Sequence, residues 1–235
     1  MIASLKNINL SFSGKKILDN FSIDFNEKKI TGLLGYSGSG KSTILKIING
    51  MVMPDAGSVQ VFGKSFDYAM GNKLRLQIGY AVQHVGIFPH MTVKENITLL
   101  ANITQQDKSK IDARLKRLLE MVQLPQSYFS KKPHQLSGGE QQRVGLCRAF
   151  FLEPPLVLMD EPFASLDYRT KSGIYHHLLH IQQEEPTSII IVTHQFEEAQ
   201  ILCDEFVWLN EGKIYKQGAK SLLTTIQNEF KEQHI

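Results

Sequence analysis

The spacing of apolar residues along this chain follows two patterns, alternation that predicts strands and helical spacing that predicts helices. Apolar and polar residues alternate over residues 3–12 and again over 21–25, a period of two that is typical of strands with one buried face. Strands with one polar face are commonly paired in antiparallel sheets. The pattern therefore predicts an antiparallel edge sheet at the start of the domain.

Short apolar runs in the rest of the chain predict buried strands. The runs at 30–34, 156–159 and 188–193 are each followed by residues with helical spacing, and this alternation is typical of a parallel sheet covered by helices. The remaining predicted elements are a helix at 43–49 that ends at Gly50, a strand at 58–62, a hairpin at 205–217 with its turn at 210–212, and a polar final helix at 220–233.

The middle of the chain differs in character from both ends. Two amphipathic helices are expected at 93–101 and 110–122, with no strand between them, which indicates a helical lobe. We therefore predict one α/β domain with a mainly parallel sheet. Its core, with the antiparallel β edge subdomain, is expected over about 1–85 and 155–235, and an inserted α-helical subdomain over about 86–154.

Composition and charge narrow the class of protein. The chain has 235 residues, of which 42% are hydrophobic and 21% charged, as in an ordinary globular protein with a buried core. Its 26 basic and 23 acidic residues leave a net charge of +3, which neither demands nor forbids a polyanionic partner, and we expect no nucleic-acid partner. The sequence contains no apolar run of the roughly 20 residues that cross a bilayer. Two distant cysteines and an N-terminus without a leader-like pattern favour a cytoplasmic location.

A glycine-rich segment between a predicted strand and a predicted helix matches the phosphate-loop pattern G-x-x-x-x-G-K-[ST]. Its backbone N–H groups can surround phosphate oxygens, and the following helix presents its positive end to the same charge. Lys41 can reach the β and γ phosphates and the Ser42 hydroxyl can coordinate Mg²⁺. A flexible glycine-serine turn would not explain the flanking strand and helix. The residues expected to bind ATP here are Gly35, Tyr36, Ser37, Gly38, Ser39, Gly40, Lys41, Ser42 and Thr43.

Three polar residues follow the ends of predicted parallel strands, where open α/β sheets bind ligands. Asp160 is placed to hold Mg²⁺, and Glu161 can accept a proton from an attacking water. His194 can hydrogen-bond the γ phosphate or that water. Alone, the carboxylates would read as solvated strand ends and the histidine as structural; beside a phosphate loop we expect Glu161 and His194 to be catalytic.

The octapeptide at 136–143, Leu-Ser-Gly-Gly-Glu-Gln-Gln-Arg, lies just before the acidic strand; we call it the signature segment. Ser137 and Glu140 have the spacing of a capping box, which starts a helix whose exposed N–H groups can bind phosphate. An ordinary helix start would explain these two residues but not the whole octapeptide. The segment resembles the signature motif of ABC ATPases.

The resemblance to ATP-binding subunits of ABC transporters covers nearly the whole chain. The phosphate loop, Gln83, the signature segment, Asp160 with Glu161, the loop at 165–167 and His194 occur in the family's order. It implies a head-to-tail homodimer that holds ATP between the phosphate loop of one copy and the signature segment of the other. Gln83 would then be a further Mg²⁺ ligand and Asp167 would communicate across the dimer. The implied contacts with the other copy's ATP are Ser137, Gly138, Gly139 and Gln141.

Two finer expectations also rest on the resemblance. Phe12 aligns with an aromatic residue that stacks on adenine in the family, although a core phenylalanine of the first strand is the competing interpretation. The segment at 88–96 resembles bacterial import ATPases. This implies separate transmembrane permease subunits, an external solute-binding protein in the full system, and a peripheral position on the cytoplasmic face of the cell membrane. The 17 residues after Gly218 (235 minus 218) are too few for an added C-terminal barrel.

Two alternatives from other classes have less support. A soluble ABC protein of translation or DNA maintenance usually carries two ATPase halves or a long coiled-coil insertion, and this sequence has neither. A P-loop GTPase or small-molecule kinase would leave the signature segment unexplained, and residues 72–75, Asn-Lys-Leu-Arg, lack the aspartate of a guanine-reading N-K-x-D. The transported substrate is not encoded in these motifs, because selectivity belongs to other chains of a transporter.

Overall fold

The computed structural model describes residues 1–68, 71–82 and 86–227. Their contacts divide the chain into two compact units, one formed by residues 1–75 with 188–235 and the other by residues 76–187. Helices and parallel strands occur together in both units, so the α/β class predicted from the sequence is confirmed. The subdomain boundaries expected from the sequence stay a prediction.

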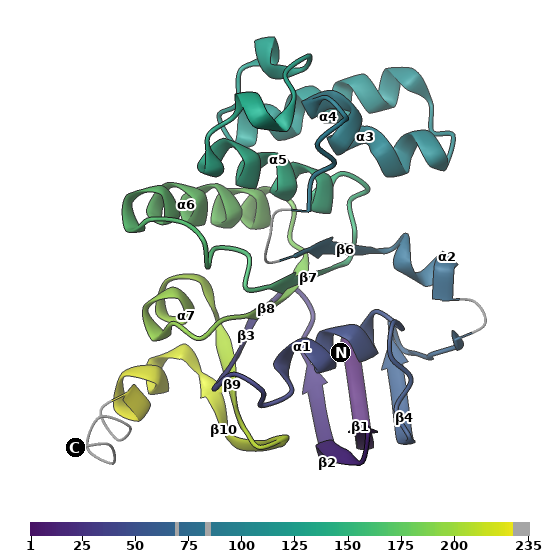
Figure 1. The fold of residues 1–235 in the computed structure, drawn as a ribbon, viewed down its shortest axis with the longest axis vertical. Helices are drawn as coiled ribbons and strands as arrows, with labels where there is room; N and C mark the ends of the chain where they lie inside the picture. The colour runs from purple at the N-terminus through teal and green to yellow at the C-terminus, as the bar shows by residue number, and fades with distance from the viewer. Residues whose placement is uncertain (69–70, 83–85, 228–235) are drawn as a thin grey trace. The chain divides into compact units, whose positions relative to one another are not determined.

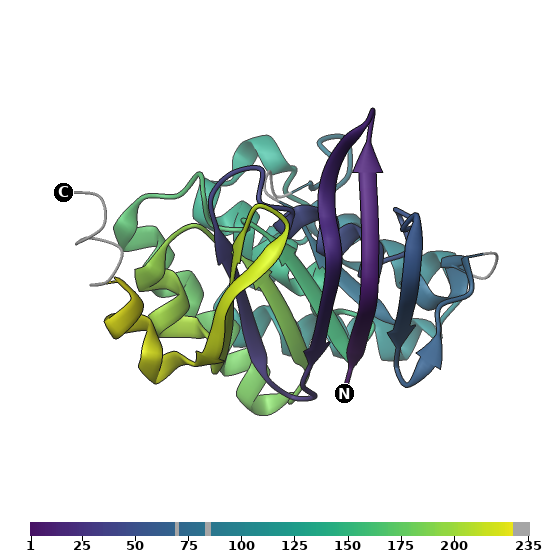
Figure 2. The same ribbon diagram turned by 90° about the horizontal axis from the view of Figure 1, so that it is seen from below.

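The first unit opens with an antiparallel sheet, as the alternating pattern predicts (Figure 2). Strand β1 lies between β2 and β4, and Ala3 pairs with Phe25 on one side and with Val61 on the other. The predicted segment at 21–25 is only the second half of β2. The strands of this sheet, in spatial order, are β2 (Lys15–Phe25), β1 (Ala3–Phe12), β4 (Ala56–Val61) and β5 (Lys64–Ser65).

The same unit contains parallel strands that carry the phosphate loop. Strand β3 pairs in parallel with β8 on one side and β9 on the other, and β9 turns back into β10 as the predicted hairpin. The predicted final helix begins as a 3₁₀ turn at Lys220–Leu222 and a helical segment at 223–227, and its later residues lie outside the described part. The bounds are β3 (Ile30–Gly35), β8 (Ser188–Val192), β9 (Glu205–Asn210), β10 (Lys213–Ala219), α1 (Lys41–Ile48), α2 (Gly71–Arg75) and α7 (Phe196–Leu202).

Among its described residues, the second unit combines a short pair of parallel strands with four α-helices, which can be followed in Figure 1. The two amphipathic helices predicted from the sequence are confirmed as α3 and α4, each within two residues of the expected bounds. Strand β6 was not expected, because its four residues are too short to show a period. The elements are β6 (Ile78–Ala81), α3 (Val93–Ile103), α4 (Lys108–Met121), 3₁₀ turns at Gln126–Tyr128 and Pro133–Gln135, α5 (Gly138–Phe150), β7 (Leu156–Asp160) and α6 (Tyr168–Glu184).

Apolar side chains of the first unit are buried where the sequence pattern places them. Leu33 and Leu34 in β3 and Ile44 and Leu45 in α1 have no exposed surface, as expected for a central strand and the inner face of its following helix. Among the residues that the structure describes, none of the helices is both long and apolar enough to cross a membrane.

Candidate functional site

The phosphate loop leaves the end of β3 through a backbone that only glycine adopts without strain. Gly35 has a φ of 141°, and a Cβ added there would lie 2.2 Å from the carbonyl oxygen of Leu209. Gly40, with a φ of 99°, forms the N-cap of α1. These two glycines let the chain reverse direction and bring its amide groups to the start of the helix.

Lys41 lies inside this loop and is only 5% exposed. Its Nζ donates to the carbonyl oxygens of Gly35 and Tyr36 at 2.8 and 2.7 Å. Burying an ammonium group costs free energy unless it is hydrogen-bonded, so these carbonyl groups stabilise its inward position. Within the described part of the chain, no side chain caps the start of α1 by a hydrogen bond. The N–H groups and the positive end of the dipole at a helix start can bind an anion.

His194 lies at the same edge of the parallel sheet as the phosphate loop. Leu33 of β3 pairs with Val192 of β8, and the Thr193 N–H donates to the Leu33 carbonyl at 3.1 Å. The two strands therefore end side by side, one at the loop and the other at the exposed His194. The fold therefore brings the phosphate loop and His194 to one edge of the sheet, as parallel pairing of β3 and β8 requires.

Aromatic rings are exposed in the same unit. Phe12, the last residue of β1, is 47% exposed, so it is not the core phenylalanine of the competing interpretation. Tyr36 in the phosphate loop is 52% exposed and contacts Trp208 edge to face, with ring centroids 6.2 Å apart. Exposed ring faces of this kind can stack on a base.

The acidic pair lies in the second unit at the end of β7. Asp160 is the last residue of the strand, and Glu161 follows it with a φ of 45°, in the left-handed region that non-glycine residues seldom adopt. Burial, with a smaller contribution from the charge of Asp160, raises the pKa of Tyr80 on neighbouring β6 to about 12. Gln83, the third expected metal ligand, lies outside the described residues.

The signature segment starts α5 with the capping box that its spacing predicts. The Glu140 N–H donates to Ser137 Oγ at 3.3 Å, and the Ser137 N–H donates to Glu140 Oε2 at 2.7 Å. The Ser137 bond is the largest cause that holds the pKa of Glu140 below its ordinary value. The Gln141 amide donates to the carbonyl oxygens of Pro133 and Leu136, so it braces the preceding turn. Its expected contact with ATP stays a prediction.

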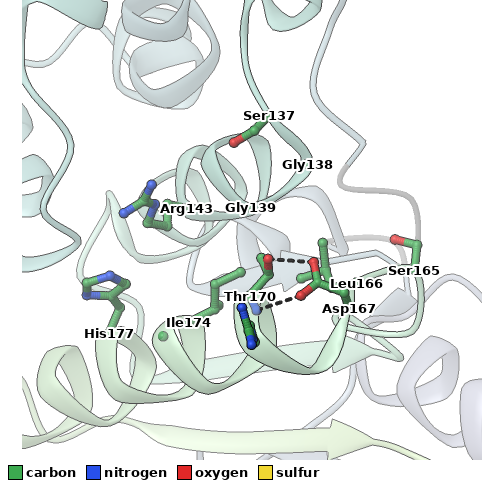
Figure 3. A pocket seen from close by; sticks show the side chains of 12 residues that line it. Ser137, Gly138, Gly139, Arg143, Ser165, Leu166, Asp167, Thr170, Ile174 and His177 are labelled. Atoms are coloured by element: carbon green, nitrogen blue, oxygen red, sulfur yellow. Dashed lines mark hydrogen bonds between the residues drawn. The ribbon is translucent and has the colours of Figure 1, made fainter.

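A cavity of about 460 Å³ opens between the starts of α5 and α6, and we call it the signature cavity. Ser137 and Gly139 line it from α5, and Asp167 and Thr170 line it from α6 (Figure 3). Asp167 is the N-cap of α6, where its side chain accepts the Thr170 N–H at 3.0 Å. The fold therefore brings two predicted sites, the signature segment and the loop at 165–167, to one cavity within a single unit.

Comparison with known proteins identifies the family. A family model described as ABC transporter matches residues 18–164. The chain belongs to the ABC transporter family. Glycine betaine/carnitine/choline transport ATP-binding protein OpuCA of Bacillus subtilis is 37% identical over 94% of this chain and 59% of that protein. Glycine betaine uptake system ATP-binding protein YehX of Escherichia coli is 36% identical over 94% of this chain and 72% of its own length.

The relatives are longer than this ABC family member. It covers 59% and 61% of the first two curated relatives, or about three fifths of their length. Among solved structures, the dimeric post-hydrolysis state of the ATP-binding cassette MJ0796, bound to ADP and Pi, matches with a TM-score of 0.81 at 28% identity. That match covers 93% of this chain and 98% of the other, so the P-loop NTPase fold of the ABC family is confirmed. The GTPase and kinase alternatives lose their support.

Sequence reasoning did not single out Thr170 or His177, two residues of α6 that line the signature cavity of this ABC chain, and it gave Arg143 no role beyond its place in the signature segment. Arg143 donates to the Val122 carbonyl at 3.4 Å, and His177 is buried in α6. Thr170 donates its hydroxyl to Asp167 at 2.6 Å. The spacing Asp-x-x-Thr at the start of a helix could have indicated Thr170, because it is the spacing of a helix cap.

Proposed function

We propose that this chain is the ATP-binding subunit of an ABC import system, and that its hydrolysis of ATP powers translocation by separate transmembrane permease subunits. One observation carries the proposal: the chain has two different helix starts suited to phosphate, one at the phosphate loop and one at the signature cavity. A single mononucleotide site needs only the first. Import is favoured because relatives such as YehX are named for uptake.

Residues of the phosphate loop are proposed to hold the triphosphate of ATP. Lys41 turns from the loop carbonyl groups toward the β and γ phosphates, and the N–H groups at the start of α1 bind the remaining charge. Tyr36, Ser37, Gly38, Ser39 and Thr43 contribute to the same cradle, and the exposed Phe12 ring stacks on adenine.

Oxygen-bearing side chains of the chain fit Mg²⁺. Ser42, Asp160 and Gln83 offer a hydroxyl, a carboxylate and an amide oxygen, the donors that this hard cation prefers. In the described ranges no three His, Cys, Asp or Glu residues cluster as a metal cage, which suits an ion held mainly by phosphate oxygens and water. When bound, the ion neutralises charge on the phosphate oxygens.

Hydrolysis is assigned to two residues at strand ends. Glu161 accepts a proton from the attacking water, and His194 donates a hydrogen bond to the γ phosphate. The strained backbone at Glu161 supports this role, because strain of this kind is concentrated at functional sites. A second copy, arranged head to tail, contributes Ser137, Gly138, Gly139 and Gln141 to the nucleotide, and Asp167 lies at that interface. The dimeric ADP and Pi state of the MJ0796 cassette supports such an assembly.

The partners and location of the subunit follow from this role. The chain would sit peripherally on the cytoplasmic face of the cell membrane, bound to its permease subunits, with an external solute-binding protein in the full system. The modest net charge of +3 gives no reason to expect nucleic acid. Co-purification with a multi-span membrane protein supports this assignment, whereas recovery with ribosomes or DNA contradicts it.

Glu161→Gln tests the proposed catalytic step. The amide cannot accept the proton, so we expect ATP hydrolysis to fall at least about 100-fold while ATP binding remains within about twofold. Hydrolysis is measured by phosphate release and binding by fluorescence of a labelled ATP. Glu184→Gln, an exposed position at the end of α6, is the matched control and should hydrolyse ATP at the normal rate. Normal turnover in Glu161→Gln would remove the proposed base.

A further inference from the structure

Thr170 occupies the third position of α6 and is bonded twice to the residue that caps this helix. Its backbone N–H donates to Asp167 Oδ1 at 3.0 Å, and its hydroxyl donates to Asp167 Oδ2 at 2.6 Å. Both oxygen atoms of the Asp167 carboxylate are thus held by one residue, which fixes the rotation of that side chain. Asp167 itself is exposed at the cavity.

The other branch of the Thr170 side chain faces the signature segment. A Cβ added to Gly139 would lie 2.6 Å from the Thr170 methyl carbon, well inside contact distance. Gly139 is helical, so its missing side chain serves the approach of α6 rather than an unusual backbone angle. Thr170 lies beside both Gly139 and Asp167 in the cavity (Figure 3). The methyl group therefore occupies the space that any side chain at position 139 would need.

The hydroxyl and the methyl group are bonded to the same carbon atom, and a β-branched side chain is stiff about its first torsion. A rotation that releases one contact therefore releases the other. We propose that Thr170 is a positioning residue that locks Asp167 to the start of α5, so that the signature segment and the dimer-facing aspartate move as one body. This inference rests on the proposed function, because it concerns how the two elements meet the other copy's nucleotide.

Two variants separate the branches of Thr170. Thr170→Val keeps the methyl group and loses the hydroxyl bond, and we expect kcat for ATP to fall about 10-fold, as for one hydrogen bond to a charged group. Thr170→Ser keeps the hydroxyl and loses the methyl group, and we expect a fall of at most about fourfold. Labelled ATP should bind the monomer normally in both variants, so the loss appears in kcat and in the protein concentration at which activity is half-maximal. Thr104→Val, which removes an exposed hydroxyl at the end of α3, is the control.

The contact with Gly139 is tested by rescue. Gly139→Ala places a methyl group against Thr170, and we expect a kcat loss of about 10-fold or more from overpacking. Adding Thr170→Ser removes the opposing methyl group, so the double variant should recover to within about fourfold of the wild type. Urea unfolding of each variant identifies any that fails to fold. If Gly139→Ala does not fold, the comparison of Thr170→Val with Thr170→Ser decides the proposal.

The possible outcomes separate this inference from the proposed function. A double variant as slow as Gly139→Ala would mean that Gly139 is needed for nucleotide approach alone, and would overturn the link. Thr170→Val with the activity of the wild type would overturn it as well. A wild-type chain that hydrolyses no ATP would overturn the proposed function and this inference together.

Discussion

Glu161 combines a strained backbone conformation with the proposed role of catalytic base. Its φ of 45° places a side chain in the left-handed region, at a cost of roughly 1–2 kcal/mol relative to ordinary backbone conformations. The residue follows directly after a strand that is buried up to Met159. The free energy of the fold therefore holds the Glu161 carboxylate at the edge of the sheet despite a local preference against this conformation.

The strain predicts an unusual order of stability at position 161. Glu161→Gly and Glu161→Ala both remove the carboxylate, but only alanine keeps a Cβ in the left-handed conformation. We expect the glycine variant to be more stable toward urea than the alanine variant by about 1 kcal/mol. At Lys116, exposed in the middle of α4, the same pair should show the reverse order by about 1 kcal/mol. Equal stability of the two position-161 variants would contradict the strain.

The sequence predicted local contacts of single residues but missed contacts between residues far apart in the chain. The capping box of Ser137 and Glu140 was predicted correctly because both partners lie within one helical turn. The methyl contact of Thr170 with Gly139 was not predicted, since the two residues are 31 positions apart (170 minus 139) and meet only through helix packing. The roles of the site residues in catalysis stay predictions.

At the scale of elements, one buried side chain organises the loop before α3. Asn96 has no exposed surface, and its Oδ1 accepts the Phe88 N–H at 2.6 Å. Its amide nitrogen donates to the carbonyl oxygens of Phe88, Met91 and Thr92 at 3.0–3.1 Å. The loop at 88–92 therefore has its polar backbone groups satisfied by a residue of the following helix.

Removing that side chain should release the loop. Asn96→Ala removes the side-chain partners of part-buried backbone groups, the Phe88 N–H and the Met91 carbonyl among them, so we expect the free energy of unfolding to fall by about 2–3 kcal/mol. Asn102→Ala, in the exposed last turn of the same helix, loses one bond to Thr98 and should change it by less than about 0.5 kcal/mol. Urea denaturation followed by circular dichroism measures both. An Asn96 variant as stable as the Asn102 variant would contradict the stabilising role of the Asn96 side chain in this loop.

Elements of ordinary length were predicted well, and short ones were not. The helices α3 and α4 and the hairpin of β9 and β10 were found from their periods. Strand β6 and helix α2 have four and five residues, which is less than the pattern needs to repeat. Strand β2 begins at Lys15, six residues before its alternation was recognised (21 minus 15), because bulges interrupt its register with β1.

At the scale of the whole molecule, buried and bonded ionisable groups make stability depend on pH in two windows. Hydrogen bonds from Lys6, from the Ser137 N–H and from Thr170 lower the pKa of Asp24, Glu140 and Asp167, respectively. Burial, with the nearby charges of Arg143, His176 and His180, lowers the pKa of His177 below its ordinary 6.5. The folded state therefore binds these protons less readily than the unfolded chain.

His177 governs the upper window. Its lowered pKa contributes stability that is complete above pH 6.5 and is lost as the pH falls through the folded value, at up to about 1.4 kcal/mol per pH unit. The carboxyl groups affect stability at lower pH, because the pKa values of Asp24 and Glu140 lie below the ordinary 3.8 and 4.5. We expect His177→Gln to lose less stability than the wild type between about pH 7.5 and 5.5, as measured by urea midpoints. His134→Gln, at an exposed histidine, should follow the wild type; equal losses in all three would contradict the assignment.

The family, the order of the longer strands and helices, the phosphate-loop pattern and the capping box could all be predicted from the amino-acid sequence. These depend on contiguous residues, whose backbone preferences and hydrogen bonds act within a few positions. The structure was needed to show that α5 and α6 meet at Gly139 and Thr170, that Asn96 holds its loop, and that Phe12 is exposed. Such contacts join residues far apart in the chain, and their distances are set by the packing of whole elements.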